Sequence, residues 1–210
     1  MHSPDIEVSV VSSQQQMTEI EPLVRQTLAD CPEYVISKSL DFAMPERWLF
    51  SVKENGNPIG WSSAGATYSA THTQPHLHLL AIVYFLFLLP PYHGQGIGRK
   101  MAHAMAKHCA ESIPLESIAD QILKIKDDDF IDLTTEVIAD CVSVPGFRTS
   151  KIFAYQFREE VFQLDTRVDF LHHFELDQDS ISMIEDTDEE FLEDSLFEEL
   201  TDQAIEFQWT

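Results

Sequence analysis

The hydrophobic pattern changes its period several times along the chain, and each change predicts an element. Ile6–Val11 has the composition of a strand. Behind two candidate N-caps, Ser12 and Ser13, apolar residues recur at helical spacing and form one stripe, which consists of Met17, Ile20, Val24 and Leu28. Pro22 falls inside this stripe, so the helix is expected to kink or to begin late.

A β-hairpin is predicted next. Arg47–Lys53 and Pro58–Thr67 have strand patterns and flank Asn55-Gly56, a dipeptide typical of tight hairpin turns. Residues 31–46 carry no clear pattern, and residues 69–75 are expected to form a polar loop. A long strand over His76–Leu89 follows and ends at two prolines.

The second half of the chain predicts helices alternating with strands. Gly96–Glu111 is expected to be a helix, Gln121–Lys126 a short strand, and Phe130–Val142 a further helix that Pro145-Gly146 stops. Residues 152–164 fit either a strand or a helix. This order predicts a mixed α/β domain in which a helix crosses between neighbouring parallel strands.

The net charge of the chain limits the classes of partner that it is expected to bind. Asp and Glu number 36 against 13 Lys and Arg, which gives a formal net charge of −23. Direct nucleic-acid binding is not expected, because Lys and Arg supply most of the affinity for phosphates. The charge instead favours cationic partners such as polyamines or basic protein tails, or it serves solubility alone.

The excess of acidic over basic residues is greatest at the C-terminal end. Beyond Arg167 the chain has no Lys or Arg but 15 Asp and Glu. This segment also carries aromatic and aliphatic residues, which acidic disordered tails usually lack. We expect a helix over Glu189–Thr201 that docks on the domain or on a partner.

Three cysteines, Cys31, Cys109 and Cys141, have no metal-ligand spacing, and Cys109 and Cys141, which fall within helical patterns, are expected to be buried free thiols. A reducing compartment, the cytoplasm or the nucleus, is therefore expected. The N-terminal residues do not form a signal peptide, and the apolar run over residues 77–91 is shorter than the roughly 20 residues of a membrane helix. Neither membrane association nor a metal site is expected, and the oligomeric state is not predicted.

Three glycines between the long strand and the next helix carry the strongest chemical signal. Gly94, Gly96 and Gly98 leave the backbone accessible where a helix begins, and unpaired N–H groups and the helix dipole favour an anion there. A P-loop would continue with Lys and Ser or Thr, and a dinucleotide fold would place the turn near the start of a βαβ unit. A diphosphate site and a tight turn without a ligand both remain open.

Residues 86–98, Leu-Phe-Leu-Leu-Pro-Pro-Tyr-His-Gly-Gln-Gly-Ile-Gly, closely resemble the acetyl-CoA motif of the GNAT acetyltransferases. Within that superfamily they look most like the type B histone acetyltransferase catalytic subunits. Residues 46–50, 60–61, 130–133 and 145–147 resemble other segments of that family. The resemblance implies a GNAT-like mixed central sheet flanked by helices over residues 46–176, with a short N-terminal region (1–45), an acidic C-terminal extension (177–210), and a helix over Ile152–Leu176.

The resemblance also implies a set of cofactor contacts. Acetyl-CoA would be the co-substrate, with its pantetheine arm pairing with a strand and its pyrophosphate held by a turn. The implied cofactor-binding residues are Leu86, Phe87, Leu88, His93, Gly94, Gln95, Gly96, Ile97, Gly98 and Arg99. The family's glutamine at the start of the motif is His93 here. The implied acceptor is a lysine of a histone tail, with another basic tail or cationic amine as the broader class.

The residues for acid–base chemistry are less well matched. The family's general base is a Glu before the last helix, and a three-residue deletion aligns that acidic pair with Asp127 and Asp128. Asp127 could equally be a helix cap. His76 and His78 share a strand face and have a side chain suited to proton transfer, or they are structural. Tyr84 could protonate the leaving sulfur, or it could be a core aromatic residue.

Two functions follow from these residues. The first is a histone-type lysine N-acetyltransferase that uses acetyl-CoA. The alternative is a non-catalytic GNAT-like interaction protein whose acidic surface binds histones or another basic partner.

Overall fold

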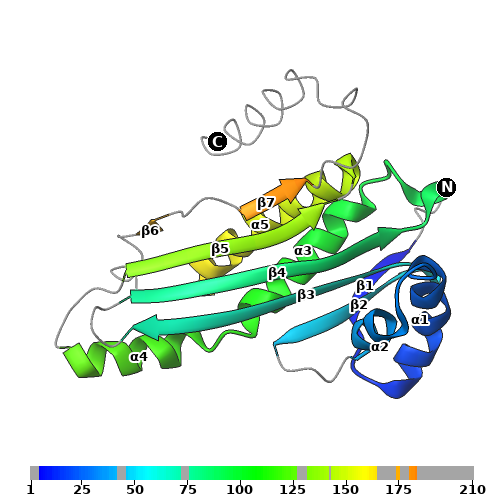
Figure 1. Cartoon of the computed structure of the whole chain (residues 1–210). Coiled ribbons are helices and arrows are strands. Elements are labelled where there is room, and N and C mark those ends of the chain that lie inside the picture. Colours follow the sequence, from blue (N-terminus) through cyan, green and yellow to red (C-terminus); the bar gives the residue numbers. More distant parts are fainter. Residues whose placement is uncertain are drawn as a thin grey trace.

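The computed structural model describes residues 5–41, 46–71, 76–126, 132–141, 143–164, 174–175 and 180–183 (Figure 1). Its elements, in chain order, are β1 (Ile6–Val10), α1 (Gln14–Thr27), α2 (Glu33–Ser39), β2 (Arg47–Glu54), β3 (Asn57–Thr71), β4 (His76–Leu88), the 3-10 turn η1 (Pro90–Tyr92), α3 (Ile97–Glu111), α4 (Leu115–Lys126), β5 (Asp132–Cys141), α5 (Val144–Leu164), β6 (Phe174–Glu175) and β7 (Ser180–Met183).

Local sequence signals correctly predicted helix α1 and the β2–β3 hairpin in the first half of the chain. Ser13 caps α1 by accepting a hydrogen bond from the backbone N–H of Gln16, and the helix includes Pro22 rather than beginning late. Asn55 and Gly56 both have positive φ, as a type I′ hairpin turn requires. The short helix α2 was missed, and β3 continues to Thr71 through the first part of the predicted polar loop.

The strands form one mixed sheet in the order β1-β2-β3-β4-β5-β6, and β7 pairs with β5 on the same side as β6. The first four strands are antiparallel neighbours, whereas β4 and β5 run parallel. Because β1 belongs to this sheet, residues before 46 contribute to the same structure as those after it. The predicted helical crossover between parallel strands is confirmed, and it contains α3 and α4 in succession.

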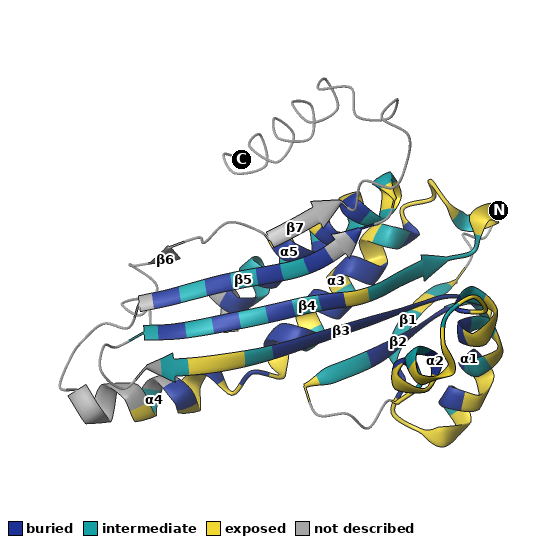
Figure 2. Cartoon of the chain, viewed as in Figure 1, coloured by how far each residue is buried: buried dark blue, intermediate teal, exposed yellow. Residues whose placement is uncertain are grey.

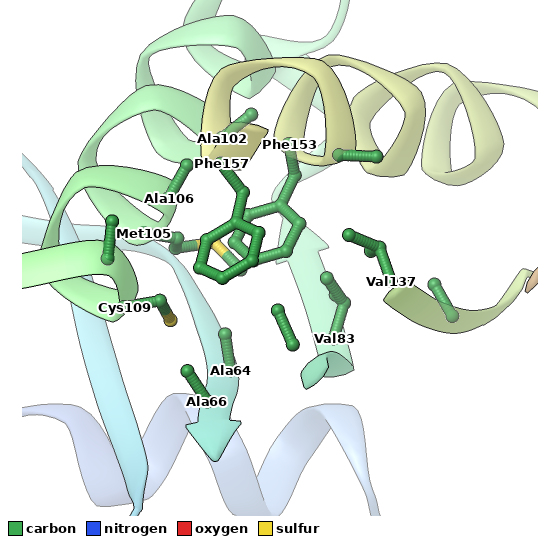
Figure 3. Close-up of a cluster of buried hydrophobic side chains, with 14 of the residues drawn as sticks. Ala64, Ala66, Val83, Ala102, Met105, Ala106, Cys109, Val137, Phe153 and Phe157 are labelled. Carbon is green, nitrogen blue, oxygen red and sulfur yellow. The ribbon is translucent and has the colours of Figure 1, made fainter. Parts of the chain in front are cut away.

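Helices cover both faces of the sheet. On one face, α1 packs over the fully buried Trp61, whose indole Nε1 donates to Thr27 Oγ1 at 3.3 Å. On the other face, α3 and α5 enclose the larger core, where Phe153 and Phe157 of α5 lie against Ala102 and Met105 of α3 (Figure 3). Buried and partly exposed residues alternate along β4 and β5, as expected for strands covered more fully on one face (Figure 2).

Three predictions for the second half were wrong. Gln121–Lys126 continues helix α4 instead of forming a strand, and residues 132–141 of the predicted helix form strand β5. β5 pairs with β4 along most of its length, and this pairing outweighs the helical pattern that its sequence shows in isolation. Pro145 lies in the first turn of α5 rather than stopping a helix, a position where its missing N–H costs nothing.

The C-terminal predictions are tested only in part. Residues 152–164 are helical, as the resemblance implied, but Phe174–Glu175 forms a strand where that helix was expected to continue. Within the acidic extension, Ser180–Met183 forms strand β7 beside β5. The predicted helix over Glu189–Thr201 lies outside the described residues.

Candidate functional site

Strand β4 carries a β-bulge at Tyr84. Phe85 pairs with Ser63 of β3, and Val83 pairs with the next residue, Ala64, so Tyr84 has no partner on that strand. A bulge bends a strand and re-aims the side chain it carries, and bulges are common beside active sites.

The parallel pairing between β4 and β5 ends at the same point. The last paired residues are Val83 and Ala139, after which β5 pairs with β7 alone and β4 with β3 alone. Residues 84–88 of β4 therefore have no described strand on their β5 side. This division of the sheet leaves main-chain groups available to a ligand that lies along β4 in an extended conformation.

Leu86 and Leu88 are the residues whose main chain faces this division. Leu89 donates its N–H to the carbonyl of Ile59 on β3, and the directions of main-chain groups alternate along a strand. Phe87 accordingly faces β3, and its carbonyl oxygen would be only 2.6 Å from a Cβ at Gly60, so that position requires glycine. Of the three residues predicted to pair with pantetheine, Leu86 and Leu88 have the suitable direction.

Beyond β4, the turn η1 and the three glycines lead into α3. Gly94 and Gly96 have φ values of +74° and +76°, and Gly96 is the N-cap of the helix. A side chain at either position would meet open space, so only backbone strain and a bound ligand would oppose it. Gly98 instead faces α5, where an added Cβ would lie 2.9 Å from Thr149 Oγ1.

Two side chains of the turn, those of His93 and Gln95, form hydrogen bonds with nearby main-chain carbonyl groups. The carbonyl of Leu88 accepts a 2.7 Å hydrogen bond from Nε2 of His93, and Nε2 of Gln95 donates to the carbonyl of Pro91 at 2.8 Å. The hydroxyl of Tyr92 donates to Glu54 at 2.9 Å and ties the turn to the end of β2, and this bond raises the pKa of Tyr92. His93 and Gln95 therefore shape the turn with their side chains.

The backbone of the turn is suited to an anion. The N–H of His93 is used by the carbonyl of Pro90, but within the described residues the N–H groups from Gly94 to Arg99 meet no acceptor. They lie at the positive end of the dipole of α3, and the side chains of Arg99 and Lys100 are exposed beside them. In a chain of net charge −23, this end of the helix is a local concentration of positive charge.

Tyr84 is not a core residue, because its side chain is 41% exposed. The guanidinium of Arg47 lies 4.6 Å from the centre of its ring, and Arg47 Nε donates to Ser63 Oγ at 2.9 Å. Burial lowers the pKa of Arg47, while Tyr84 and Asp41 oppose that shift. The ring therefore lies beside Gly65 of β3 and against the guanidinium of Arg47. Sequence analysis missed this arrangement because Arg47 and Tyr84 are far apart in the chain.

His76 and His78 share a face of β4, as predicted, but they lie at its other end. His78 Nε2 is 3.1 Å from a carboxylate oxygen of Glu136 on β5. Six residues, or about 20 Å of strand, separate His78 from Tyr84. A direct role for His78 in chemistry near Tyr84 is not supported by this placement.

Asp127 and Asp128 lie outside the described residues. The strand predicted to end just before them is instead the last part of helix α4, and residues 132–141 of the helix predicted after them form strand β5.

Comparison with known families identifies the fold. Residues 15–120, half of the chain, match the acetyltransferase (GNAT) family. The chain belongs to this family. The predicted GNAT-like mixed α/β fold is therefore confirmed, and acetyl-CoA is the co-substrate of the family's enzymes. Comparison with curated proteins found no match to this chain.

Solved structures with a similar arrangement include several acetyltransferases. AAC(6')-Iy in complex with a bisubstrate analogue has 11% identity and a TM-score of 0.42, and the match covers 57% of this chain and 88% of the AAC(6')-Iy chain. The aminoglycoside 6'-N-acetyltransferase AAC(6')-Ih from Acinetobacter baumannii has 13% identity and a TM-score of 0.39, and the match covers 57% of this chain and 88% of the AAC(6')-Ih chain. Tetrahymena Gcn5 has 11% identity and a TM-score of 0.34, with coverages of 50% and 64%. None of these similarities indicates which acceptor substrate this GNAT protein would use.

Proposed function

We propose that this protein transfers the acetyl group of acetyl-CoA to a lysine amine on a basic protein tail, of the kind that histones carry. Acetyl transfer is the chemistry of the GNAT family. The observation that supports the cofactor site is the division between β4 and β5, which lies directly before the amide-lined turn at Gly94–Arg99.

In this proposal the cofactor follows the chain from strand to helix. The pyrophosphate binds the N–H groups of Gly94 to Arg99, where the helix dipole adds to their attraction. The pantetheine arm extends along β4 and hydrogen-bonds the main chain of Leu86 and the N–H of Leu88, whose carbonyl is already bonded to His93. This path brings the thioester to the bulge at Tyr84.

Tyr84 is then the residue nearest to the reacting atoms. The acceptor nitrogen attacks the thioester carbonyl carbon and releases its proton to solvent, and the carbon–sulfur bond breaks. The departing sulfur takes a proton from the Tyr84 hydroxyl, which is restored from water. Holding the amine and thioester together supplies much of the rate acceleration, so a strong general base is not essential.

The acceptor is inferred from charge and from the resemblance of residues 86–98 to type B histone acetyltransferases. A chain with a net charge of −23 attracts a cationic tail over a long range at low salt. We place the protein in the cytoplasm or nucleus, where its three cysteines, none of which is in a disulfide, would remain reduced.

The test separates cofactor binding from transfer. Thermal unfolding is measured with and without acetyl-CoA, because a ligand at a hundred times its Kd stabilises the native state by about 2.7 kcal/mol. Acetylated product is then measured by mass spectrometry with a histone-tail peptide, spermine and an aminoglycoside at equal concentrations. We expect stabilisation, and the highest rate with the peptide.

The other outcomes distinguish the alternatives. Stabilisation without product from any amine would favour the non-catalytic interaction protein. A higher rate with spermine or the aminoglycoside would show that the proposed acceptor is wrong, but it would still support an acetyltransferase activity. No response to acetyl-CoA would overturn the cofactor site.

A further inference from the structure

Strand β3 extends past its neighbour β2 and presents an open edge. The pairing of β2 with β3 ends at Arg47 and Gly65, and one further bond joins Ala66 N–H to the carbonyl of Glu46. Beyond that bond, residues 67–71 pair with β4 on one side, and no described strand pairs with them on the other (Figure 1). Glu46 has a φ of +60°, so the chain turns there as it enters β2.

The direction of the main-chain groups on this edge follows from the same bond. Because the N–H of Ala66 faces β2, the N–H and carbonyl groups of Tyr68 and Ala70 face the open side. Proteins usually protect such an edge with charge, proline or a bulge. Residues 67–71, Thr-Tyr-Ser-Ala-Thr, contain no charged residue and no proline. The edge is therefore able to pair with an added strand.

A pocket opens directly beside this edge. Its volume is about 220 Å³, and it lies between the start of β2, the end of β3 and the turn after α3. Its lining residues are Glu46, Trp48, Ala66, Thr67, Tyr68, Ser112, Ile113 and Pro114. Small-molecule sites usually occupy about 300–1,000 Å³, so this pocket suits a single side chain better than a whole ligand.

The chemistry of the lining favours a long cationic side chain. Trp48 and Tyr68 provide aromatic surface for a cation, and the exposed carboxylate of Glu46 provides the opposite charge. Ile113 and Pro114 can contact the aliphatic stem of a lysine or arginine. Tyr68 is 44% exposed, so its ring is accessible from solvent.

We infer that an extended peptide carrying Lys or Arg docks as an added strand on β3, with one cationic side chain in the Glu46–Trp48–Tyr68 pocket. The main-chain bonds to Tyr68 and Ala70 hold the peptide, and the pocket sets its register and selects for positive charge. The net charge of −23 adds a long-range attraction for such a peptide.

This docking edge is separate from the cofactor site. Tyr68 is in register with Leu79 of β4, and the nine residues from Leu79 to Leu88 span about 30 Å. The edge is thus an anchoring surface for a basic chain at a distance from the acetyl group. Its existence does not depend on the proposed acetyl transfer, since peptide binding can be measured without acetyl-CoA.

The test uses a fluorescent eight-residue peptide of alternating Lys and Thr with the full-length protein. A second peptide of the same sequence, N-methylated at every backbone amide, keeps the charge but has no N–H to donate from either edge. We expect fluorescence anisotropy to show binding of the first peptide and at least tenfold weaker binding of the second. Gly96→Asp should leave this binding unchanged.

Three protein variants locate the site. Ala70→Pro removes one edge donor and leaves the β4 side of the strand intact, and should weaken binding about fivefold. Glu46→Gln and Tyr68→Thr should weaken it roughly three- to tenfold through loss of the cation site. Glu7→Gln, at an exposed position of strand β1, is the matched control for loss of one negative charge and should have little effect.

Several results would overturn the inference. Equal affinity for the two peptides, or equal effects of Glu46→Gln and Glu7→Gln, would show attraction to the overall charge alone. A dimer in sedimentation that Ala70→Pro dissociates would show that a second copy of the chain occupies the edge instead. Absence of binding by the folded wild-type protein would also overturn it.

Discussion

The guanidinium of Arg47 lies 4.6 Å from the centre of the Tyr84 ring, and so joins the first residue of β2 to the bulged residue of β4. Between these two strands lies β3, whose Ser63 accepts a hydrogen bond from the same arginine. Three strands therefore fix the exposed side chain of Tyr84, whose backbone lies at the point where β4 separates from β5. This is the position that the proposed cofactor path assigns to the thioester.

Tyr84→Phe tests that assignment. Removing the hydroxyl should lower kcat roughly 100-fold, because positioned acid–base groups contribute about 10²–10⁴-fold, while the acetyl-CoA thermal shift stays unchanged. Steady-state kinetics with the histone-tail peptide measures the effect. Tyr34→Phe, on the exposed face of α2, is the control. An unaltered kcat in Tyr84→Phe would show that the sulfur is protonated by another group.

Gly96→Asp and Gly96→Asn test the anion site with two side chains of nearly equal size. Both residues tolerate the positive φ at Gly96 better than other side chains, and both are good N-caps. Only Asp brings a negative charge to the proposed pyrophosphate position. We expect Asp to abolish the acetyl-CoA thermal shift and Asn to retain part of it. Equal shifts in the two variants would contradict a diphosphate at this turn.

Acid should destabilise the protein through His108. Burial lowers the pKa of this imidazole, with Glu111 opposing the shift, and its Nε2 is buried without a hydrogen-bond partner. The unfolded chain takes up a proton near pH 6.5, whereas the folded chain resists it. The free energy of unfolding should therefore fall as pH drops below about 6.5 towards the lowered pKa.

The variant His108→Gln isolates this contribution. Its urea unfolding curves at several pH values should show a shallower loss of stability on acidification than the wild type. The same substitution at exposed His103 in the same helix is the matched control and should leave the slope nearly unchanged. An identical slope in His108→Gln would assign the acid sensitivity to other groups.

The acidic C-terminal residues should act mainly through long-range charge. A deletion for this test begins at residue 184, because Ser180–Met183 forms strand β7 and belongs to the sheet. Removing residues 184–210 should weaken binding of the alternating Lys-Thr peptide several-fold at about 20 mM salt and much less at about 300 mM, where charges are screened. An equal loss at both salt concentrations would indicate contact by packing.

The sequence alone predicted the elements whose signals are local. The Ser13 cap, the Asn55-Gly56 turn and the glycines before α3 each fix the backbone over a few residues, so their effect can be read without knowing the rest of the chain. The glycine pattern also located the candidate anion site. Local patterns failed for β5, whose strand conformation depends on pairing with β4.

Only the tertiary structure determined which main-chain and side-chain groups meet. The bulge at Tyr84, the end of pairing at Val83, and the open edge at Tyr68 all depend on register between strands far apart in sequence. Register arises from the packing of whole strands and helices, and no short segment encodes it. For the same reason the sequence could place Gly96 at a helix start but could not place Arg47 over Tyr84.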